Sequence, residues 1–252
     1  IYAAGAQRSQ PIKRVRLRGW RAALATLACA LPVAFGFAAP AAYLAIEAWE
    51  RYVFAGLSPR IVAEAGNTAM FAAMATVIAV GLGLVVTGAA RLRPGRFTQT
   101  LARVSTLGYA VPGTILAIGL LPVITLADRQ IDAVARAIWG SGPGLLLLGS
   151  GAALIYAYTA RFLAIATGGI ESGLSRVPPS LDHVARTLGR TPAAVFREVH
   201  VPISRPALAA AGLLIFVDCV KELPATLLLR PLNFETLATH LYGEAARGTY
   251  EE

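Results

Sequence analysis

Four long uncharged stretches limit what this chain can fold into. Each is longer than the roughly 20 residues that a helix needs to cross the hydrocarbon core of a bilayer. The chain is therefore predicted to be an integral membrane protein. The charged residues that bound the stretches are Arg21 and Glu47, Glu64 and Arg91, Arg103 and Asp128, and Arg136 and Arg161.

The composition supports this prediction and favours helices over strands. Hydrophobic residues make up 56% of the chain and charged residues 15%, and the mean hydropathy is +0.60. A soluble domain carries about 25% charged residues. The uncharged stretches show no period-two alternation, which argues against a β-barrel. We expect an all-α, polytopic helical bundle with spans at about 22–46, 66–90, 104–127, 141–160 and, interrupted by charges, 206–229.

The placement of the basic residues predicts an orientation. With a cytoplasmic N-terminus, the inner segments carry sixteen Lys and Arg residues, Arg161 among them, and the two outer loops carry four. Inner loops of membrane proteins show such an excess. The net charge of +9 is therefore interpreted as topology and contact with anionic lipid, and not as a nucleic-acid surface. Trp20, Trp49 and Trp139 flank spans, as interfacial anchors do.

The remaining segments complete the expected organisation. Residues 1–20 are predicted to be a basic cytoplasmic leader, and 21–252 a single transmembrane domain with an inner loop at 161–205 and outer loops near 47–65 and 128–140. An amphipathic outer helix is expected at 232–247, started by Asn233. Pro112 and Pro122 should kink the third span. The chain begins with Ile and has five visible spans, so we expect a fragment that lacks a sixth. Cys29 and Cys219 are expected to be packing residues.

The inner loop is too long to be only a turn, and its pattern predicts two short helices. In SLDHVARTLGR, Ser180 can cap a helix and Gly189 can close it. The stripe of this first helix is Val184, Ala185 and Leu188.

The second short helix is predicted in TPAAVFREVHVP. Thr191 is its expected N-cap, and Pro202 is expected to end it. Val195, Phe196 and Val199 form its apolar face. Such a helix pair can lie in a groove on a soluble partner or rest on lipid, and the pattern alone leaves both open.

The spacing of this loop resembles that of importer permeases of the ATP-binding cassette (ABC) class. Their inner loop has Glu-Ala-Ala, three residues, Gly, nine residues, Ile, one residue and Leu-Pro. His183 and Val184 stand where the pattern has Glu and Ala. The resemblance implies the type I importer permease fold and a coupling role for the loop toward a separate ATPase. The residues so implicated are His183, Val184, Ala185, Gly189, Phe196, Val199 and Pro202.

A second resemblance is narrower and concerns the substrate. The stretch VDCVKELPATLLLRPLNFETLA, at 217–238, resembles the fifth-span region of ferric-iron permeases in which two six-span halves are fused. The stretches VRLRGWRA and LPVAFGFAAP resemble the start of the second half. The resemblance implies a multi-pass protein of the bacterial inner membrane. Its partners would be an ATPase dimer, an outer iron-binding protein and the other permease half, fused or as a homodimer.

No Gly-rich loop ending in Gly-Lys-Ser/Thr occurs in the chain, so it has no phosphate cradle of that kind. We therefore expect no enzyme activity and no cofactor in this chain, with ATP and Mg²⁺ bound by the partner ATPase.

Three charges interrupt the fifth span. Asp218, Lys221 and Glu222 have i,i+3 and i,i+4 spacing, so on a helix they share one face with a net charge of −1; Pro224 follows. Charged groups inside a membrane usually face a bundle interior or a water-filled path. We expect this face to line the translocation path near an outer gate. The alternative is an ion pair that only fixes packing. Direct iron ligation is disfavoured, since tight ligation would oppose release.

Other assignments remain open on the sequence. The histidines His183, His200 and His240 have no metal-ligand spacing, so surface or packing roles are expected. A permease for thiamine, sulfate or a polyamine would share the loop spacing. A membrane-embedded enzyme lacks a supporting motif, and a channel would not need a loop that docks a partner.

Overall fold

The computed structural model describes residues 16–248. Within these residues all the regular secondary structure is helical, and there is no strand. Five helices are long and apolar enough to cross a membrane, which confirms the all-α polytopic fold. Most of the predicted basic leader lies outside the described residues. The chain divides after Ser58 into two compact units, and each is taken by itself.

The first unit is one nearly continuous helix. It comprises α1 (Trp20–Val33), a π-helical turn η1 (Ala34–Ala38) and α2 (Ala39–Ala55). Pro40 cannot donate a backbone hydrogen bond, and the wider turn directly before it accommodates the missing donor. The helix continues past the predicted end at residue 46, so Glu47 and Glu50 are helical and not part of an outer loop.

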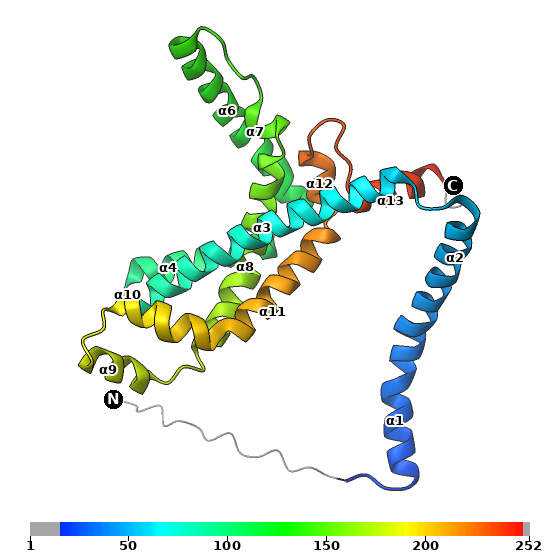
Figure 1. Ribbon diagram of the computed structural model, residues 1–252, viewed down its shortest axis with the longest axis horizontal. Helices are drawn as coiled ribbons and strands as arrows, with labels where there is room; N and C mark the ends of the chain where they lie inside the picture. The colour runs from blue at the N-terminus through cyan, green and yellow to red at the C-terminus, as the bar shows by residue number, and fades with distance from the viewer. Residues whose placement is uncertain (1–15, 249–252) are drawn as a thin grey trace. The chain divides into compact units, whose positions relative to one another are not determined.

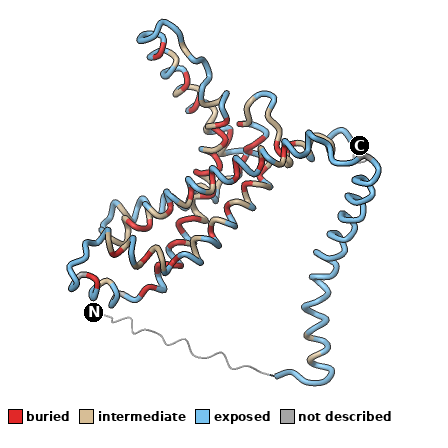
Figure 2. The backbone as a smooth tube through the Cα atoms, viewed as in Figure 1, coloured by how far each residue is buried: buried red, intermediate tan, exposed pale blue. Residues whose placement is uncertain are grey.

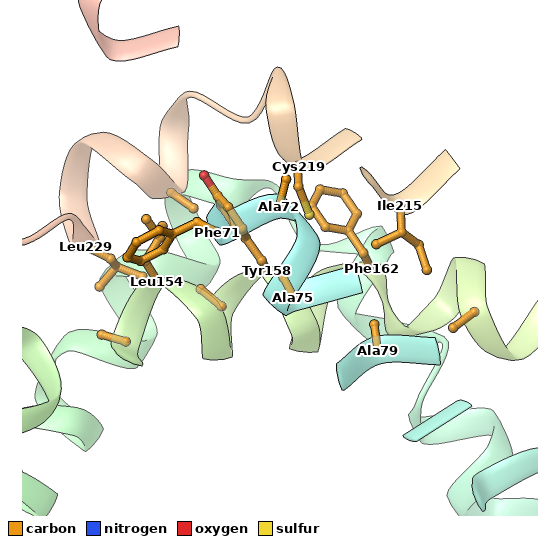
Figure 3. Close-up of a cluster of buried hydrophobic side chains, with 14 of the residues drawn as sticks. Phe71, Ala72, Ala75, Ala79, Leu154, Tyr158, Phe162, Ile215, Cys219 and Leu229 are labelled. Atoms are coloured by element: carbon orange, nitrogen blue, oxygen red, sulfur yellow. The ribbon is translucent and has the colours of Figure 1, made fainter. Parts of the chain in front are cut away.

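Three long helices form the core of the second unit. They are α3 (Pro59–Leu92), α8 (Ala152–Leu174) and α11 (Val201–Val220), which run side by side (Figure 1). Buried residues gather where the three meet (Figure 2). The cluster in Figure 3 shows Phe71 and Ala75 of α3 against Tyr158 and Phe162 of α8 and Ile215 of α11.

Small residues let these helices approach closely. A Cβ atom at Gly83 of α3 would lie 2.8 Å from the Ala166 Cβ of α8, and one at Gly169 of α8 would lie 2.7 Å from the Ala211 Cβ of α11. Helices in lipid gain little from the hydrophobic effect, so close van der Waals contact is what holds them together.

The predicted third span is a broken helix. It consists of α4 (Arg96–Val104), α5 (Leu107–Ala110) and α6 (Gly113–Trp139). Pro112 has an extended conformation and precedes α6, so it breaks the chain where a kink was expected, while Pro122 lies inside α6. The predicted outer loop at 128–140 is helical to Trp139. Asp128 is buried there, accepting backbone hydrogen bonds from Leu147 (2.7 Å) and Leu148 (3.1 Å) around α7 (Leu146–Gly149).

The fourth span lies further along the chain than predicted. Helix α8 covers 152–174 and not 141–160, so Arg161 is in its middle and not in an inner loop. The segment between the spanning helices then shrinks from 161–205 to 175–191. The predicted span ends at Arg161 because a lone charge usually marks the end of a span, but in the fold the charge of Arg161 is paired with Glu222.

The segment at 175–191 holds one short helix, α9 (Pro179–Thr187). The second predicted helix is the start of a spanning helix: α10 (Pro192–Val195), a π turn η2 (Phe196–His200) and α11 are continuous. Thr191 is the N-cap, as predicted, and accepts from the Ala194 backbone N–H at 3.3 Å. Pro202 does not end the helix, because η2 accommodates its missing donor.

Two helices follow α11. The first is α12 (Pro224–Leu229), and the second, α13 (Leu237–Arg247), begins later than predicted. Asn233 has a φ of 60° and belongs to the preceding turn, while the side chain of Thr236 caps α13. The Leu237 backbone N–H donates to Thr68 Oγ1 at 2.9 Å, which fixes α13 to α3.

The backbones of α5 and α8 come very close together at Gly108. A Cβ atom at Gly108 would lie 2.0 Å from the Ala160 carbonyl oxygen, which cannot move aside as a side chain can. Gly108→Ala should lower the free energy of unfolding by about 1–3 kcal/mol, measured as thermal unfolding in detergent. Gly119→Ala is the control, because nothing lies within 4 Å of its Cβ position. Equal melting of the two variants would contradict the packing.

Candidate functional site

The loop predicted to couple to an ATPase forms an elbow. Helix α9 ends at Thr187, and the chain turns at Gly189, whose φ of +77° is a conformation that glycine adopts readily. The backbone N–H groups of Leu188 and Arg190 donate to the carbonyls of Val184 and Ala185, each at 3.1 Å. We name residues 179–195, from α9 through α10, the elbow.

The apolar residues of α9 point in two directions. Ala185 is buried, while Val184 and Leu188 are 56% and 76% exposed. The predicted stripe is therefore not one buried face. With Leu181, which is also exposed, Val184 and Leu188 have i,i+3,i+7 spacing and form an outward apolar face. His183 is exposed as well.

The helix after the elbow packs on α3. Val195 is buried, and Phe196, Val199 and Pro202 are half-buried. The Phe196 ring fills the space beside Gly88, where a Cβ atom would lie 2.8 Å from the ring. This contact joins the start of the spanning helix Pro192–Val220 to the end of α3.

A charged cluster at the elbow was not predicted. Asp182 accepts hydrogen bonds from Arg91 of α3 (3.4 Å) and from His200 of η2 (2.5 Å). Burial favours the neutral acid, but the hydrogen bond from His200 and the charge and hydrogen bond of Arg91 outweigh it, so the pKa of Asp182 lies below its usual value. In the sequence, the one sign of this cluster was the position of Asp182, directly before His183 at the start of the loop pattern.

Two of the three histidines, His200 and His240, contact acids inside the fold. His240 Nδ1 lies 3.0 Å from Glu64 of α3, and His200 is almost fully buried, so both pack within the fold. Cys29 and Cys219 are free thiols. Within residues 16–248, no three or more His, Cys, Asp or Glu side chains are grouped as a metal site would require.

The three charges of the fifth span do not share a helix face. Helix α11 ends at Val220, and the chain turns at Lys221. Asp218 and Lys221 form an ion pair at 2.7 Å, and the hydrogen bond to Asp218 raises the pKa of the Lys221 ammonium. Glu222 turns away and accepts from Arg161 of α8 at 2.8 Å. The expected net charge of −1 is wrong, since both acids have a basic partner.

The Arg161–Glu222 pair lies where three elements meet. A Cβ atom at Gly113, the first residue of α6, would lie 1.9 Å from Arg161 Nη1 and 2.5 Å from Glu222 Oε1. Behind the pair, Thr226 of α12 donates to the Glu222 carbonyl at 2.5 Å, and its hydroxyl lies 2.5 Å from that of Tyr158. Pro224 begins α12. The pair therefore joins α8, the start of α6 and the turn after α11.

Breaking this pair should be costly. Glu222→Gln leaves the Arg161 charge without its partner, a loss of up to about 3–5 kcal/mol in a fully buried pair, and less here since the Arg161 side chain is 20% exposed. Thermal unfolding in detergent should show a large loss for Glu222→Gln and partial recovery in Arg161→Gln/Glu222→Gln. Asp218→Asn is the control: its partner Lys221 is 70% exposed, so its effect should be small. Equal losses from Asp218→Asn and Glu222→Gln would count against the assignment.

Comparison with known proteins agrees with this architecture. The chain is 24% identical over 184 residues to the Fe(3+)-transport system permease protein FbpB 2 of Haemophilus influenzae, covering 73% of this chain and 33% of that protein. It is 30% identical over 152 residues to the trehalose transport system permease protein SugB of Mycobacterium tuberculosis, covering 59% of this chain and 52% of that protein. The maltose/maltodextrin permease MalG of Escherichia coli is 37% identical over 86 residues, 34% of this chain and 29% of MalG. The chain thus spans between about a third and about half of these relatives.

A solved structure shares the fold. It is a bacterial ABC transporter involved in the import of the acidic polysaccharide alginate, with a TM-score of 0.65 and 14% identity, covering 92% of this chain and 86% of that one. Residues 79–240 match the family described as binding-protein-dependent transport system inner membrane component. That match covers more than half of the chain, and the chain belongs to this family of importer permeases.

Proposed function

We propose that this permease forms part of the path of an ATP-driven importer and is driven by a separate ATPase that binds its elbow. The outward apolar face of α9 carries the proposal, because Leu181, Val184 and Leu188 are exposed on a helix that is anchored from behind. A short amphipathic helix of this kind fits a groove on a soluble partner. ATP and Mg²⁺ would be bound by that partner, which places the elbow on the cytoplasmic side of the inner membrane.

The continuity of the last spanning helix supports mechanical coupling. The helix runs from Pro192 at the elbow to Val220, directly before the Arg161–Glu222 pair. Movement of the elbow would therefore act on the turn that carries Asp218, Lys221 and Glu222. In this proposal, the turn is part of a gate that differs between inward-open and outward-open states. Its charges are paired in the present state, so the gate is closed by ion pairs and offers no open cation site.

Ferric iron is the substrate that we propose. The iron permease of Haemophilus influenzae aligns with 73% of this chain, and the segment around Asp218 resembles ferric-iron permeases. The pairs Asp218–Lys221 and Arg161–Glu222 each have no net charge, so they offer no strong site for a cation. In this proposal, an outer binding protein therefore binds the iron firmly. The second permease half, fused or as a second copy, would complete the path.

A sugar is the second candidate. The trehalose permease of Mycobacterium tuberculosis has the higher identity, 30%, over a shorter part of the chain. A polar, uncharged substrate would also tolerate a gate in which the charges are paired. The iron proposal rests on the larger share of this chain that aligns with the iron permease and on the resemblance of the segment around Asp218. The sugar proposal rests on the higher sequence identity to the trehalose permease.

Uptake into vesicles distinguishes the two. The full-length permease would be reconstituted with its ATPase and binding protein, and radiolabelled ferric iron, trehalose and maltose compared with and without ATP. We expect ATP-dependent accumulation of iron alone. Accumulation of either sugar would overturn the substrate assignment, and uptake that does not depend on ATP would overturn the importer proposal.

The glycine of the elbow provides a further test. Gly189→Val places a β-branched side chain at a φ of +77°, which costs about 1–2 kcal/mol for an L residue. We expect less substrate transported per ATP hydrolysed, with membrane insertion unchanged. Gly189→Asn should retain most coupling, since asparagine tolerates this conformation. There is space for both side chains, because nothing lies within 4 Å of the Cβ position. Unchanged coupling in Gly189→Val would count against the role of the elbow.

A further inference from the structure

Helix α9 is attached to the rest of the fold mainly by polar contacts. Of its apolar side chains, Ala185 is buried, whereas Leu181, Val184 and Leu188 are exposed. A helix with so little apolar burial is poorly fixed by packing alone. What holds its inward side is the carboxylate of Asp182.

Arg91 connects this carboxylate to two helices. It stands at the end of α3 and donates to the backbone carbonyls of Leu174 (2.8 Å) and Val177 (3.3 Å), at the end of α8 and just after it. Its Nη2 also donates to Asp182 Oδ2 at 3.4 Å. One planar guanidinium thus ties α3, the end of α8 and α9 together, a geometry that a lysine ammonium cannot reproduce.

His200 fixes the other oxygen of Asp182. Its side chain is 1% exposed, and Nε2 lies 2.5 Å from Oδ1. Nδ1 is buried without a hydrogen-bond partner. An N–H at that position would be a buried, unpaired donor, so the proton belongs on Nε2, donated to Asp182. The π turn η2 carries His200 at the start of the last spanning helix, and its ring lies edge-on to Phe196.

We propose that Arg91, Asp182 and His200 are positioning residues for coupling. They clamp α9 to the end of α3 and to the start of α11, so that a displacement of α9 by the ATPase moves both helices together. The apolar face of α9 binds the partner, and the clamp on the opposite side transmits the movement. This inference rests on the proposed function, because it concerns what the elbow does once an ATPase is bound.

A pair of substitutions at His200 tests the geometry. The amide nitrogen of His200→Gln reaches the position of Nε2 and can still donate to Asp182. His200→Asn is shorter, reaches only the position of Nδ1 and loses the contact. Mutations in coupling networks change coupling by about 0.5–2 kcal/mol, which is roughly 2- to 30-fold. We expect substrate transported per ATP to fall within this range in His200→Asn and to stay within about twofold of wild type in His200→Gln.

Substitutions at the other two members have matched controls. Asp182→Asn should uncouple, whereas Asp132→Asn should not, although it also removes an ion-paired acid, because Asp132 pairs with Arg136 in α6. Arg91→Gln should uncouple and Arg93→Gln should not. Arg93 lies two residues away and is exposed, and it forms no ion pair within residues 16–248.

Three measurements on the full assembly separate the outcomes: ATPase retention in pull-down, ATP hydrolysis, and substrate transported per ATP. The clamp is supported if its variants retain the ATPase and hydrolyse ATP but transport less per ATP, with His200→Gln close to wild type. It is overturned if clamp and control variants couple equally, or if His200→Gln and His200→Asn are equally impaired. If the wild-type permease retains no ATPase, the proposed function fails first, and the clamp with it.

Discussion

The need to satisfy every buried carboxylate of the described helices and turns governs this structure. An isolated charge at the centre of a bilayer costs roughly 2.5–3.5 kcal/mol on insertion scales. The chain places Arg161 in the middle of α8 and Glu222 just after α11, and the two meet at 2.8 Å. Gly113 leaves room for them, since a side chain there would overlap both. The same need explains Asp128, which is buried in α6 and satisfied by two backbone N–H groups.

Four of the prolines in this fold show two different effects, apart from those that lie inside helices, such as Pro122. Pro40 and Pro202 follow π-helical turns, and the helix continues through both. Pro112 and Pro224 stand at the start of new helices, and the chain changes direction at both. The difference lies in whether the preceding turn can widen to accommodate the missing donor. Pro112 and Pro224 adjoin the Arg161–Glu222 pair, where two helix breaks meet the end of the continuous helix, and Pro202 adjoins the elbow at the start of that helix.

The sequence predicted the class of fold and the elbow, but not how the charges pair. Uncharged runs indicated the spans, and local chemistry indicated Thr191 as a cap and Gly189 as the turn after α9, because caps and glycine turns depend on few neighbours. Arg161 was placed in a loop because a charged residue usually marks the end of a span unless a partner for it is known. Its partner, Glu222, is 61 residues away in the sequence, so local patterns could not reveal it. Asp182 was missed for the same reason, as its partners come from α3 and η2. Continuity through Pro202 could not be foreseen, because a π turn leaves no simple pattern.

The unbroken helix from Pro192 to Val220 has a mechanical consequence. Its 29 residues span about 43 Å at 1.5 Å per residue. A rigid rod of this length converts a tilt of about 5° at one end into a shift of about 4 Å at the other. That shift exceeds the reach of a hydrogen bond. A small rocking of the elbow end would therefore suffice to separate Arg161 and Glu222, which now touch near the other end of this helix.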